Sequence, residues 1–318
     1  MSKRKRSLLL PAFLLLAPLT GAEPGIVSES AETIRYREVD GTETLLTKHP
    51  RRTIIGNASF ADPWFTAGGT AIGVPTVRSQ QALPEQARDL PRIGALRSLN
   101  LERIYAMKPD LVLINANLHA HRAVRHHLID AEIPNVALDY ANFHDYAGIL
   151  DLFCRLNGGS VENNPTAKRI ISQVKKLTHE TERLPSPRFA VLFVASGGFV
   201  LESGDLNVPT MAEMLGGTNV AKQASGRLKY SFEQLLIDDP DVIFINTMGD
   251  SKALQEKFTR DLIRRPAWGE LKAAKTGRVH FLPPELFLYM AGSRYPEAFL
   301  HLARLLHPGK IPCIGDKR

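Results

Sequence analysis

Two stretches of the chain share one pattern of polar and apolar positions. Residues 99–115 read LNLERIYAMKPDLVLIN, and residues 230–246 read YSFEQLLIDDPDVIFIN. In each copy an amphipathic segment is followed by Pro-Asp and then by a continuous apolar run that ends in Asn. Proline cannot continue a helix, and a continuous apolar run is typical of a parallel strand covered on both faces. Each copy predicts a short helix, a break and a buried strand, and the repeat predicts two similar α/β lobes.

The remaining apolar pattern fills in both lobes. Ahead of the first copy we expect a hairpin within 31–50, an inner strand at 53–56, a helix that carries Trp64 and Phe65, a strand at 74–77 and a loop over 78–98. After it we expect a helix at 119–131 and a strand at 135–138. In the second lobe the pattern predicts strands at 189–194 and 279–282, and helices at 210–215, 258–262 and 296–306.

Two helical patterns separate the lobes, at 143–156 and 165–184. Asn164 and Pro165 are typical of the cap and first position of the second helix. Its apolar residues fall on one stripe, and no flexible Gly/Ser linker interrupts it. We therefore divide the chain into an N-terminal lobe at 23–142, linking helices at 143–187 and a C-terminal lobe at 188–318. The long helix should hold the lobes rigidly apart.

The first 22 residues form a different kind of segment. A basic run at 3–6 precedes an apolar run at 8–19, which is too short to span a bilayer, and small residues follow at 20–22. This order predicts a secretory signal peptide and a periplasmic location. No Cys lies near the cleavage site, which argues against a lipid anchor. Cleavage lowers the formal charge of the chain from +7 to +3, so its basic character does not indicate nucleic-acid binding.

The sequence offers little support for catalysis or for a bare metal ion. Four histidines crowd residues 119–127, but the second lobe adds only His280 near a strand end, so we expect no metal site. A secreted hydrolase is the alternative of another class, but Ser196-Gly197-Gly198 is not a nucleophile motif. Cys154 and Cys313 are the two cysteines, and both a disulfide and two free thiols stay open.

The repeated stretch resembles a known family. NLERIYAMKPDLVL is similar to N-x-E-x-I-x-x-x-x-P-D-L-V, a pattern of the periplasmic substrate-binding proteins of ABC importers for iron–siderophore complexes, haem and vitamin B12. The resemblance covers roughly residues 45–306 and implies two Rossmann-like lobes with parallel sheets, bridged by one long helix, with ligand in the cleft. It also implies that Glu102 and Glu233 dock onto an ABC permease dimer. The alternative is that both are helix-start charges favoured by the helix dipole.

Ligands of open parallel sheets bind beyond the carboxyl ends of the strands. That rule selects Asn57, Ser59, Asn115 and His119 in the first lobe, with Asn117 beside them, and Ser196, Asn246 and Thr247 in the second; each could instead be a turn former. The resemblance adds Arg97 and Arg227 from the loops before the two glutamates. Aromatic stretches frame the same opening and add Trp64, Tyr289 and Arg294.

These residues lead to one functional expectation with alternatives. We expect a monomeric binding protein, not an enzyme, without a cofactor, that delivers a ferric siderophore-type complex to an ABC permease. Arg227 and Arg97 would grip carboxylate or catecholate oxygens in bidentate fashion. Haem and cobalamin are alternative ligands, although the loops before the two glutamates lack the Trp residues that the resemblance associates with corrin binding. His119 could ligate a haem or ferric iron in part.

Overall fold

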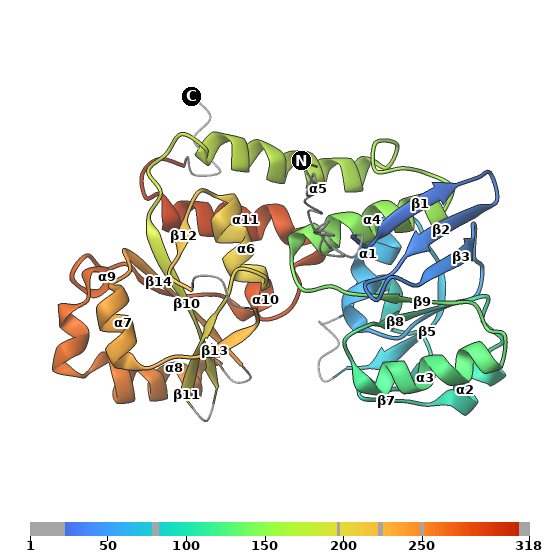
Figure 1. The fold of residues 1–318 in the computed structure, drawn as a ribbon, viewed down its shortest axis with the longest axis horizontal. Coiled ribbons are helices and arrows are strands. Elements are labelled where there is room, and N and C mark those ends of the chain that lie inside the picture. The colour runs from blue at the N-terminus through green and yellow to red at the C-terminus, as the bar shows by residue number, and fades with distance from the viewer. Residues whose placement is uncertain (1–22, 78–82, 196–197, 222–224, 249–250, 312–318) are drawn as a thin grey trace, which may run out of the picture.

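The computed structural model describes residues 23–77, 83–195, 198–221, 225–248 and 251–311. Two α/β lobes lie side by side, and helix α5 (Pro165–Thr181) runs across the top of both (Figure 1). The predicted signal peptide falls outside the described residues. Within the described part of the chain, no helix combines the length and apolar character needed to cross a membrane.

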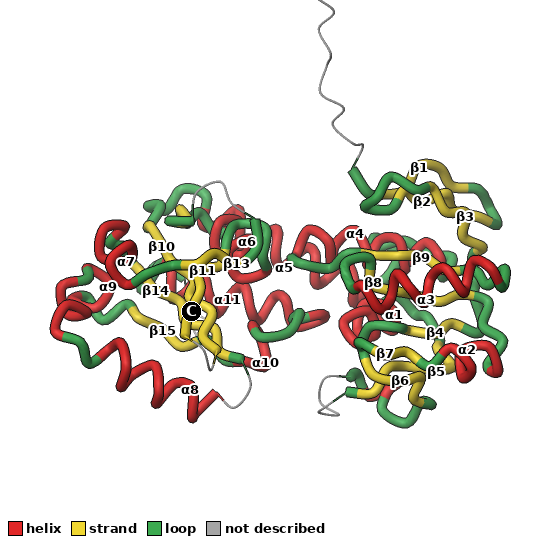
Figure 2. Tube along the Cα trace, turned by 60° about the horizontal axis from the view of Figure 1, so that its bottom comes forward, coloured by secondary structure: helices red, strands yellow, loops and turns green. Residues whose placement is uncertain are grey.

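The N-terminal lobe is built on a six-stranded sheet in the order β7-β6-β5-β4-β8-β9, in which only β7 runs antiparallel to its neighbour. Its elements are β4 (Thr53–Ile55), α1 (Ala61–Thr66), β5 (Ala71–Thr76), β6 (Arg92–Ala95), β7 (Ser98–Leu99), α2 (Leu101–Ala106), β8 (Leu111–Asn115), α3 (His119–Asp130) and β9 (Asn135–Leu138). A small antiparallel sheet precedes it and lies against one side of the lobe, as Figure 2 shows; its strands are β1 (Gly25–Glu29), β2 (Thr33–Arg37) and β3 (Glu43–Thr47). Strands β2 and β3 are the expected hairpin.

The expectation of a loop over 78–98 is wrong for part of that segment, because β6 and a 3₁₀ turn at Glu85–Ala87 lie within it. Strand β6 escapes the pattern because its four residues, RIGA, contain no apolar run. Gly94 has φ +103°, and a Cβ there would lie 2.4 Å from the Ser98 carbonyl oxygen. Only glycine allows the chain to turn back so tightly onto β7.

The C-terminal lobe has a mixed sheet in the order β13-β11-β10-β14-β15, with β12 beside the start of β10. Its elements are β10 (Arg188–Ala195), β11 (Gly198–Glu202), α6 (Asn207–Met214), β12 (Thr218–Asn219), β13 (Arg227–Lys229), α7 (Phe232–Asp238), β14 (Val242–Thr247), α8 (Ser251–Phe258), α9 (Lys272–Lys275), β15 (Val279–Phe281), α10 (Pro284–Phe287) and α11 (Tyr295–Leu306). The expectation of an entirely parallel sheet is wrong here, because β11 and β13 are antiparallel to their neighbours. The connection from β10 to β11 is too short for a parallel crossover.

The repeated stretch forms α2–β8 in one lobe and α7–β14 in the other. Asn100 caps α2 and Ser231 caps α7, each by accepting a backbone N–H three residues later. The residue before each proline has a left-handed backbone, with φ 45° at Lys108 and φ 38° at Asp239. Such a backbone is uncommon for residues other than glycine, so its recurrence marks the same turn in both lobes.

The aspartates of the two Pro-Asp breaks explain why the pattern is repeated. The carboxylate of Asp110 accepts the backbone N–H groups of Arg51 and Arg52, at 2.7 and 2.9 Å, just before β4. The carboxylate of Asp241 accepts the backbone N–H of Arg188 at 2.8 Å, where β10 begins. Each aspartate therefore fixes the start of the strand that pairs with its own, β4 with β8 and β10 with β14.

One hydrophobic core runs through both lobes. It contains buried strand residues from each sheet, such as Leu113 and Phe244, together with the inner faces of α4 (Phe143–Leu156), α5 and α11. Two smaller cores lie under α2 and α3 and under α7 to α9. The lobes are thus joined by packed side chains as well as by the bridging helix, and close packing resists movement of one lobe against the other.

Candidate functional site

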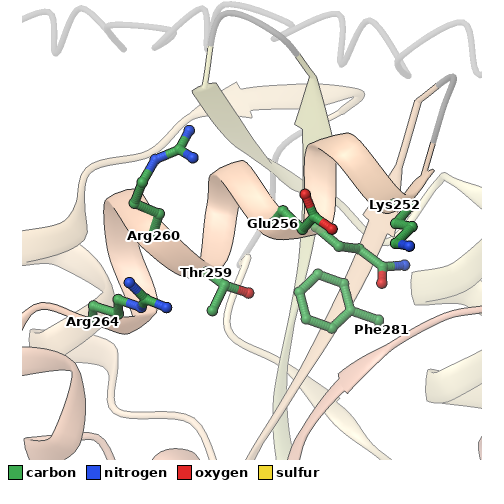
Figure 3. Close-up of a pocket in the computed structure, with 7 residues that line it drawn as sticks. Lys252, Glu256, Thr259, Arg260, Arg264 and Phe281 are labelled. Carbon is green, nitrogen blue, oxygen red and sulfur yellow. The ribbon is translucent and has the colours of Figure 1, made fainter.

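Two hollows of different character open on the described surface. The wider one, about 440 Å³, belongs to the C-terminal lobe alone and lies between α8, the following π-helical turn and β15 (Figure 3). Its walls are mostly charged side chains on the exposed side of one helix, and they come from Lys252, Gln255, Glu256, Thr259, Arg260, Arg264 and Phe281. None of the predicted site residues lines this hollow.

The second pocket, about 70 Å³, lies where the two lobes join. Its walls come from the end of β14, from α6, from the segment after α10 and from Ala141, which follows the last strand of the N-terminal lobe. The lining residues are Ala141, Glu202, Leu206, Asn207, Val208, Arg227, Asn246, Phe287, Leu288, Tyr289 and Met290. Three of the predicted ligand-binding residues, Arg227, Asn246 and Tyr289, therefore come together in one pocket.

Asn246 and Asn207 are buried in the walls of this pocket, and each has one end of its amide fixed. The Asn246 side-chain NH₂ donates to the Phe287 carbonyl oxygen at 3.1 Å, and its Oδ1 is buried without a protein partner. The Asn207 Oδ1 accepts the Tyr295 hydroxyl at 2.9 Å, and its Nδ2 is buried without a protein partner. The pocket wall thus contains one unpaired acceptor and one unpaired donor.

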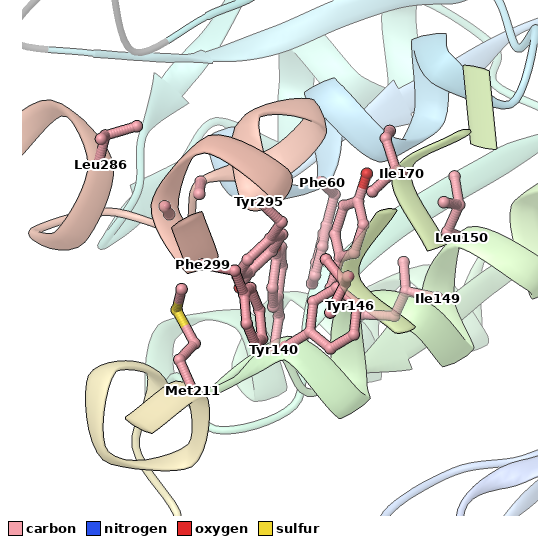
Figure 4. Close-up of a cluster of buried hydrophobic side chains, with 14 of the residues drawn as sticks. Phe60, Tyr140, Tyr146, Ile149, Leu150, Ile170, Met211, Leu286, Tyr295 and Phe299 are labelled. Atoms are coloured by element: carbon pink, nitrogen blue, oxygen red, sulfur yellow. The ribbon is translucent and has the colours of Figure 1, made fainter. Parts of the chain in front are cut away.

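The tyrosine that orients Asn207 belongs to the aromatic cluster at the junction of the lobes (Figure 4). The Tyr295 ring lies 4.8 Å from the Tyr146 ring and 5.0 Å from the Phe143 ring, between centroids. Complete burial raises the pKa of Tyr295, so its hydroxyl stays protonated and donates. The position of Asn207 therefore depends on the core that joins the lobes.

Arg227 is held by a partner that the sequence did not reveal. Its Nε and Nη2 donate to the same Glu202 carboxylate oxygen at 3.1 and 3.0 Å, and its guanidinium carbon lies 3.5 Å from the Phe193 ring centroid. Glu202 is 3% exposed, and burial raises the pKa of its carboxyl despite the arginine. The bidentate edge of Arg227 is therefore occupied, and the expectation that it grips ligand oxygens in bidentate fashion is wrong. The available signal was the lone acid at the end of FVLE, in register with Arg227.

In the N-terminal lobe, the strand-end asparagines serve as turn formers. The Asn57 side chain accepts the Ser59 backbone N–H at 3.1 Å, and the Asn115 side chain accepts the N–H groups of Asn117 and Leu118 at 3.0 and 3.1 Å. Both asparagines are buried, and Ser59 is half-buried. None of them lines either hollow, so their ligand-binding role stays a prediction.

The histidine that matters structurally in α3 is His121, two residues beyond the predicted His119. His121 is fully buried; its Nδ1 accepts the Asn115 backbone N–H at 3.0 Å, and its Nε2 lies 2.8 Å from the Leu96 carbonyl oxygen. Burial lowers its pKa and keeps the ring neutral, with Nε2 as the donor. This histidine ties the turn that carries Arg97 to the end of β8. His119 and Arg97 are both exposed on the rim of the lobe.

Trp64 is not a cleft residue, and this correction follows from its burial. The ring is 0% exposed and packs edge-on against Phe153 with centroids 5.0 Å apart. Its indole N–H donates to the Thr70 carbonyl oxygen at 3.0 Å. Helix α1 is packed against α4, so its largest side chain belongs to the core that joins the lobes.

The segment from 283 to 294 divides into a pocket wall and a clasp between the lobes. Tyr289 is 63% exposed at the pocket, whereas the guanidinium of Arg294 forms two 2.8 Å hydrogen bonds with Glu297 in the first turn of α11. Arg294 therefore serves the helix start. Next to it, the Asp62 carboxylate of the N-terminal lobe accepts the backbone N–H and the hydroxyl of Ser293 at 2.6 and 2.8 Å. This clasp fixes the segment that forms the pocket wall.

Glu102 and Glu233 occupy equivalent places, each two residues after the cap of its helix, and both are exposed. Helices α2 and α7 lie in opposite lobes (Figure 1). The backbone N–H of Glu233 and the Ser231 hydroxyl lower the pKa of the Glu233 carboxyl. The structure thus presents the matched pair of anions that the repeat predicts.

Two further predictions concern residues outside the described part of the chain. Ser196 and Cys313 both lie there, so neither the strand-end role of the serine nor a disulfide with Cys154 is tested. Cys154 is buried, and burial raises the pKa of its thiol to about 11. Among the described residues, no three His, Cys, Asp or Glu side chains are grouped to hold a metal ion.

Comparisons with known proteins agree with this architecture. The profile described as "Periplasmic binding protein" matches residues 59–286. The chain is 25% identical to the Fe(3+)-citrate-binding protein YfmC of Bacillus subtilis over 86% of this chain and 87% of that protein, and 22% identical to the high-affinity heme uptake system protein IsdE of Staphylococcus aureus over 75% and 81%. The crystal structure of an ABC transporter substrate-binding protein from Listeria monocytogenes superposes with a TM-score of 0.70 at 21% identity, over 82% of this chain and 99% of that one. The chain therefore belongs to the periplasmic binding protein family.

Proposed function

We propose that this chain is the substrate-binding component of an ABC importer and that it carries a ferric siderophore-type complex in the periplasm. The observation that carries this proposal is the pocket at the junction of the lobes, in which Arg227, Asn246 and Tyr289 meet at the carboxyl end of a parallel strand. A relative named for ferric citrate binding supports the choice of a ferric complex.

The pocket is small compared with a whole ferric complex, so we propose that it receives one arm of the ligand. The rest of the complex would lie between the lobes, where the exposed Tyr289 and the rim residues Arg97 and His119 can contact it. Arg227 would act through the part of its guanidinium that remains exposed, since 45% of its side chain is accessible beside Glu202. No step in this proposal requires catalysis.

Haem is the second candidate, because a relative from a haem uptake system covers most of the chain. The two candidates are separated by the absorbance and native mass of protein purified from its own periplasm. A charge-transfer band with the mass of a ferric complex supports the first proposal, and a Soret band supports haem. A protein that carries neither and binds no ferric complex in calorimetric titration would refute both.

We further propose that Glu102 and Glu233 dock the protein onto the permease. A permease with two similar subunits needs matched anions at matched places, and the two glutamates occupy equivalent positions on helices of opposite lobes. Charges at the rim of an interface mainly set orientation and association rate. Substitution of both should therefore impair uptake and leave ligand affinity unchanged.

A further inference from the structure

The pocket at the junction of the lobes contains two polar atoms that the protein leaves unpaired. Asn246 is 3% exposed and Asn207 is 7% exposed, so neither amide is solvated like a surface side chain. The Asn246 Oδ1 can only accept a hydrogen bond and the Asn207 Nδ2 can only donate one. Buried polar atoms without partners are rare in native proteins, because each costs free energy until a partner arrives.

The orientation of both amides is fixed by their other ends. Rotation of the Asn246 amide would turn its oxygen toward the Phe287 carbonyl oxygen and lose the 3.1 Å hydrogen bond. Rotation of the Asn207 amide would turn its NH₂ toward the Tyr295 hydroxyl, which now donates to it at 2.9 Å. The free acceptor and the free donor are therefore properties of the folded chain before any ligand binds.

The charge of the pocket narrows the chemistry of its ligand. The one cation, Arg227, is already paired with the buried Glu202 carboxylate, so the two charges compensate each other. A carboxylate has no donor for the Asn246 Oδ1 and would bring a second anion close to Glu202. An ammonium group has no acceptor for the Asn207 Nδ2. A neutral group with one donor and one acceptor satisfies both asparagines.

The size of the pocket narrows it further. A volume of about 70 Å³ exceeds the ~10–15 Å³ that one water needs, so a single hydroxyl would leave most of the space unfilled. The remaining walls are apolar and come from Leu206, Val208 and Met290. A planar secondary amide with its flanking carbons supplies the donor, the acceptor and the apolar surface together.

We infer that this pocket binds a secondary amide group of the ligand, with the ligand N–H donating to Asn246 Oδ1 and the ligand carbonyl accepting from Asn207 Nδ2. The inference rests on the proposed function and names the class of ferric complex, one whose chelator contains secondary amides. It excludes ferric citrate and haem as preferred ligands, because their free polar groups are carboxylates and hydroxyls. A site built for a hydrogen-bonding group rejects the analogue that lacks it.

Isothermal titration calorimetry on the mature chain tests this inference with four probes. They are the ferric complex of a linear trihydroxamate with secondary amides in its backbone, the same complex with those amide nitrogens methylated, ferric citrate and haemin. We expect the secondary-amide complex to bind about tenfold or more tightly than its methylated analogue, because the analogue leaves the Asn246 acceptor buried and unpaired. Asn246→Ala should weaken binding of the first complex about tenfold and should not weaken binding of the second.

Asn135→Ala is a matched control in the other lobe. Asn135 is also buried, its NH₂ donates to the Ile133 carbonyl oxygen at 2.9 Å, and its Oδ1 is also unpaired, but it lies outside the pocket. It should lower the melting temperature as Asn246→Ala does and leave ligand affinity unchanged.

Three results would overturn the inference. Equal affinity for the two trihydroxamate complexes would mean that the amide N–H is not recognised. Tightest binding of ferric citrate or haemin would leave an iron-type binding protein in place and refute the amide pocket alone. Binding of none of the four probes would refute the proposed function, and the inference would fail with it.

Discussion

Removal of the Arg227 guanidinium should make the stability of the protein depend on pH through one buried carboxyl group. In the wild-type protein Glu202 is 3% exposed, and its pKa is already raised by burial, although the two hydrogen bonds from Arg227 act to lower it. Arg227→Ala leaves burial and removes the compensation. The pKa of Glu202 should therefore rise further, and the folded protein should bind a proton that the unfolded chain does not bind.

The sign and the size of the effect follow from linkage. Between the unfolded and folded pKa values only the folded state holds the proton, so stability falls as pH rises, by about 1.4 kcal/mol per pH unit for one group. Breaking a fully buried ion pair costs roughly 3–5 kcal/mol. The Arg227 side chain is 45% exposed, so we expect a smaller loss of about 2 kcal/mol at pH 8 and little loss near pH 5.

Urea unfolding at pH 5, 6, 7 and 8 measures this effect. Arg294→Ala is the matched control, because Arg294 also forms a bidentate pair, with Glu297, but both side chains are about half exposed. That variant should lose at most about 1 kcal/mol and show no added dependence on pH above 5. Glu202→Gln combined with Arg227→Ala should abolish the pH dependence. Parallel curves for wild type and Arg227→Ala across this range would refute the buried-carboxylate account.

Three other predictions test the lobes and their surfaces. Glu102→Lys and Glu233→Lys should each reduce uptake of the ligand, and the double variant should reduce it most, with wild-type affinity in calorimetry; loss of affinity would place these glutamates in the ligand site instead. Gly292→Ala should lower the free energy of unfolding by about 1–3 kcal/mol, because φ is +57° and the new Cβ would lie 2.5 Å from the Asp62 Cγ. Gly148→Ala, in the middle of α4 with nothing near the added Cβ, should raise it by about 0.5–1 kcal/mol, and equal effects at both sites would contradict the clasp. Scattering profiles with and without ligand should nearly superimpose, because α5 and the shared core resist domain closure; a marked contraction would refute the rigid scaffold.

The parts of the fold that the sequence predicts are those in which neighbouring residues along the chain determine the structure. The break at Pro109, the cap at Asn164 and the stripe of α5 are local signals, and the structure confirms the elements they predict. The antiparallel strands of the C-terminal lobe were missed because FVLE and RLK are short and carry charged residues. Their pairing depends on contacts across the sheet, which no local pattern contains.

The candidate site shows the same division. The strand-end rule selects Asn246 correctly, because the position of a residue at the end of a strand is visible in the sequence. It cannot tell Asn57 or Asn115, which cap their own turns, from a residue that faces a pocket. Trp64 was misjudged because a large aromatic side chain suits a core and a binding wall equally well, and only packing against another helix decides between them.

The shared core also constrains how the protein can select a ligand. A binding protein that closes around its ligand can adjust its contacts as it closes, but these lobes are joined by Tyr295 and its aromatic neighbours and by the Asp62–Ser293 clasp. Groups that cannot move must be aimed in advance, and the protein aims Asn207 through Tyr295 and Asn246 through the backbone of Phe287. Discrimination in such a site comes from the mismatch of wrong groups with fixed donors and acceptors. The same residues that keep the lobes from moving therefore determine which ligand groups the pocket can accept.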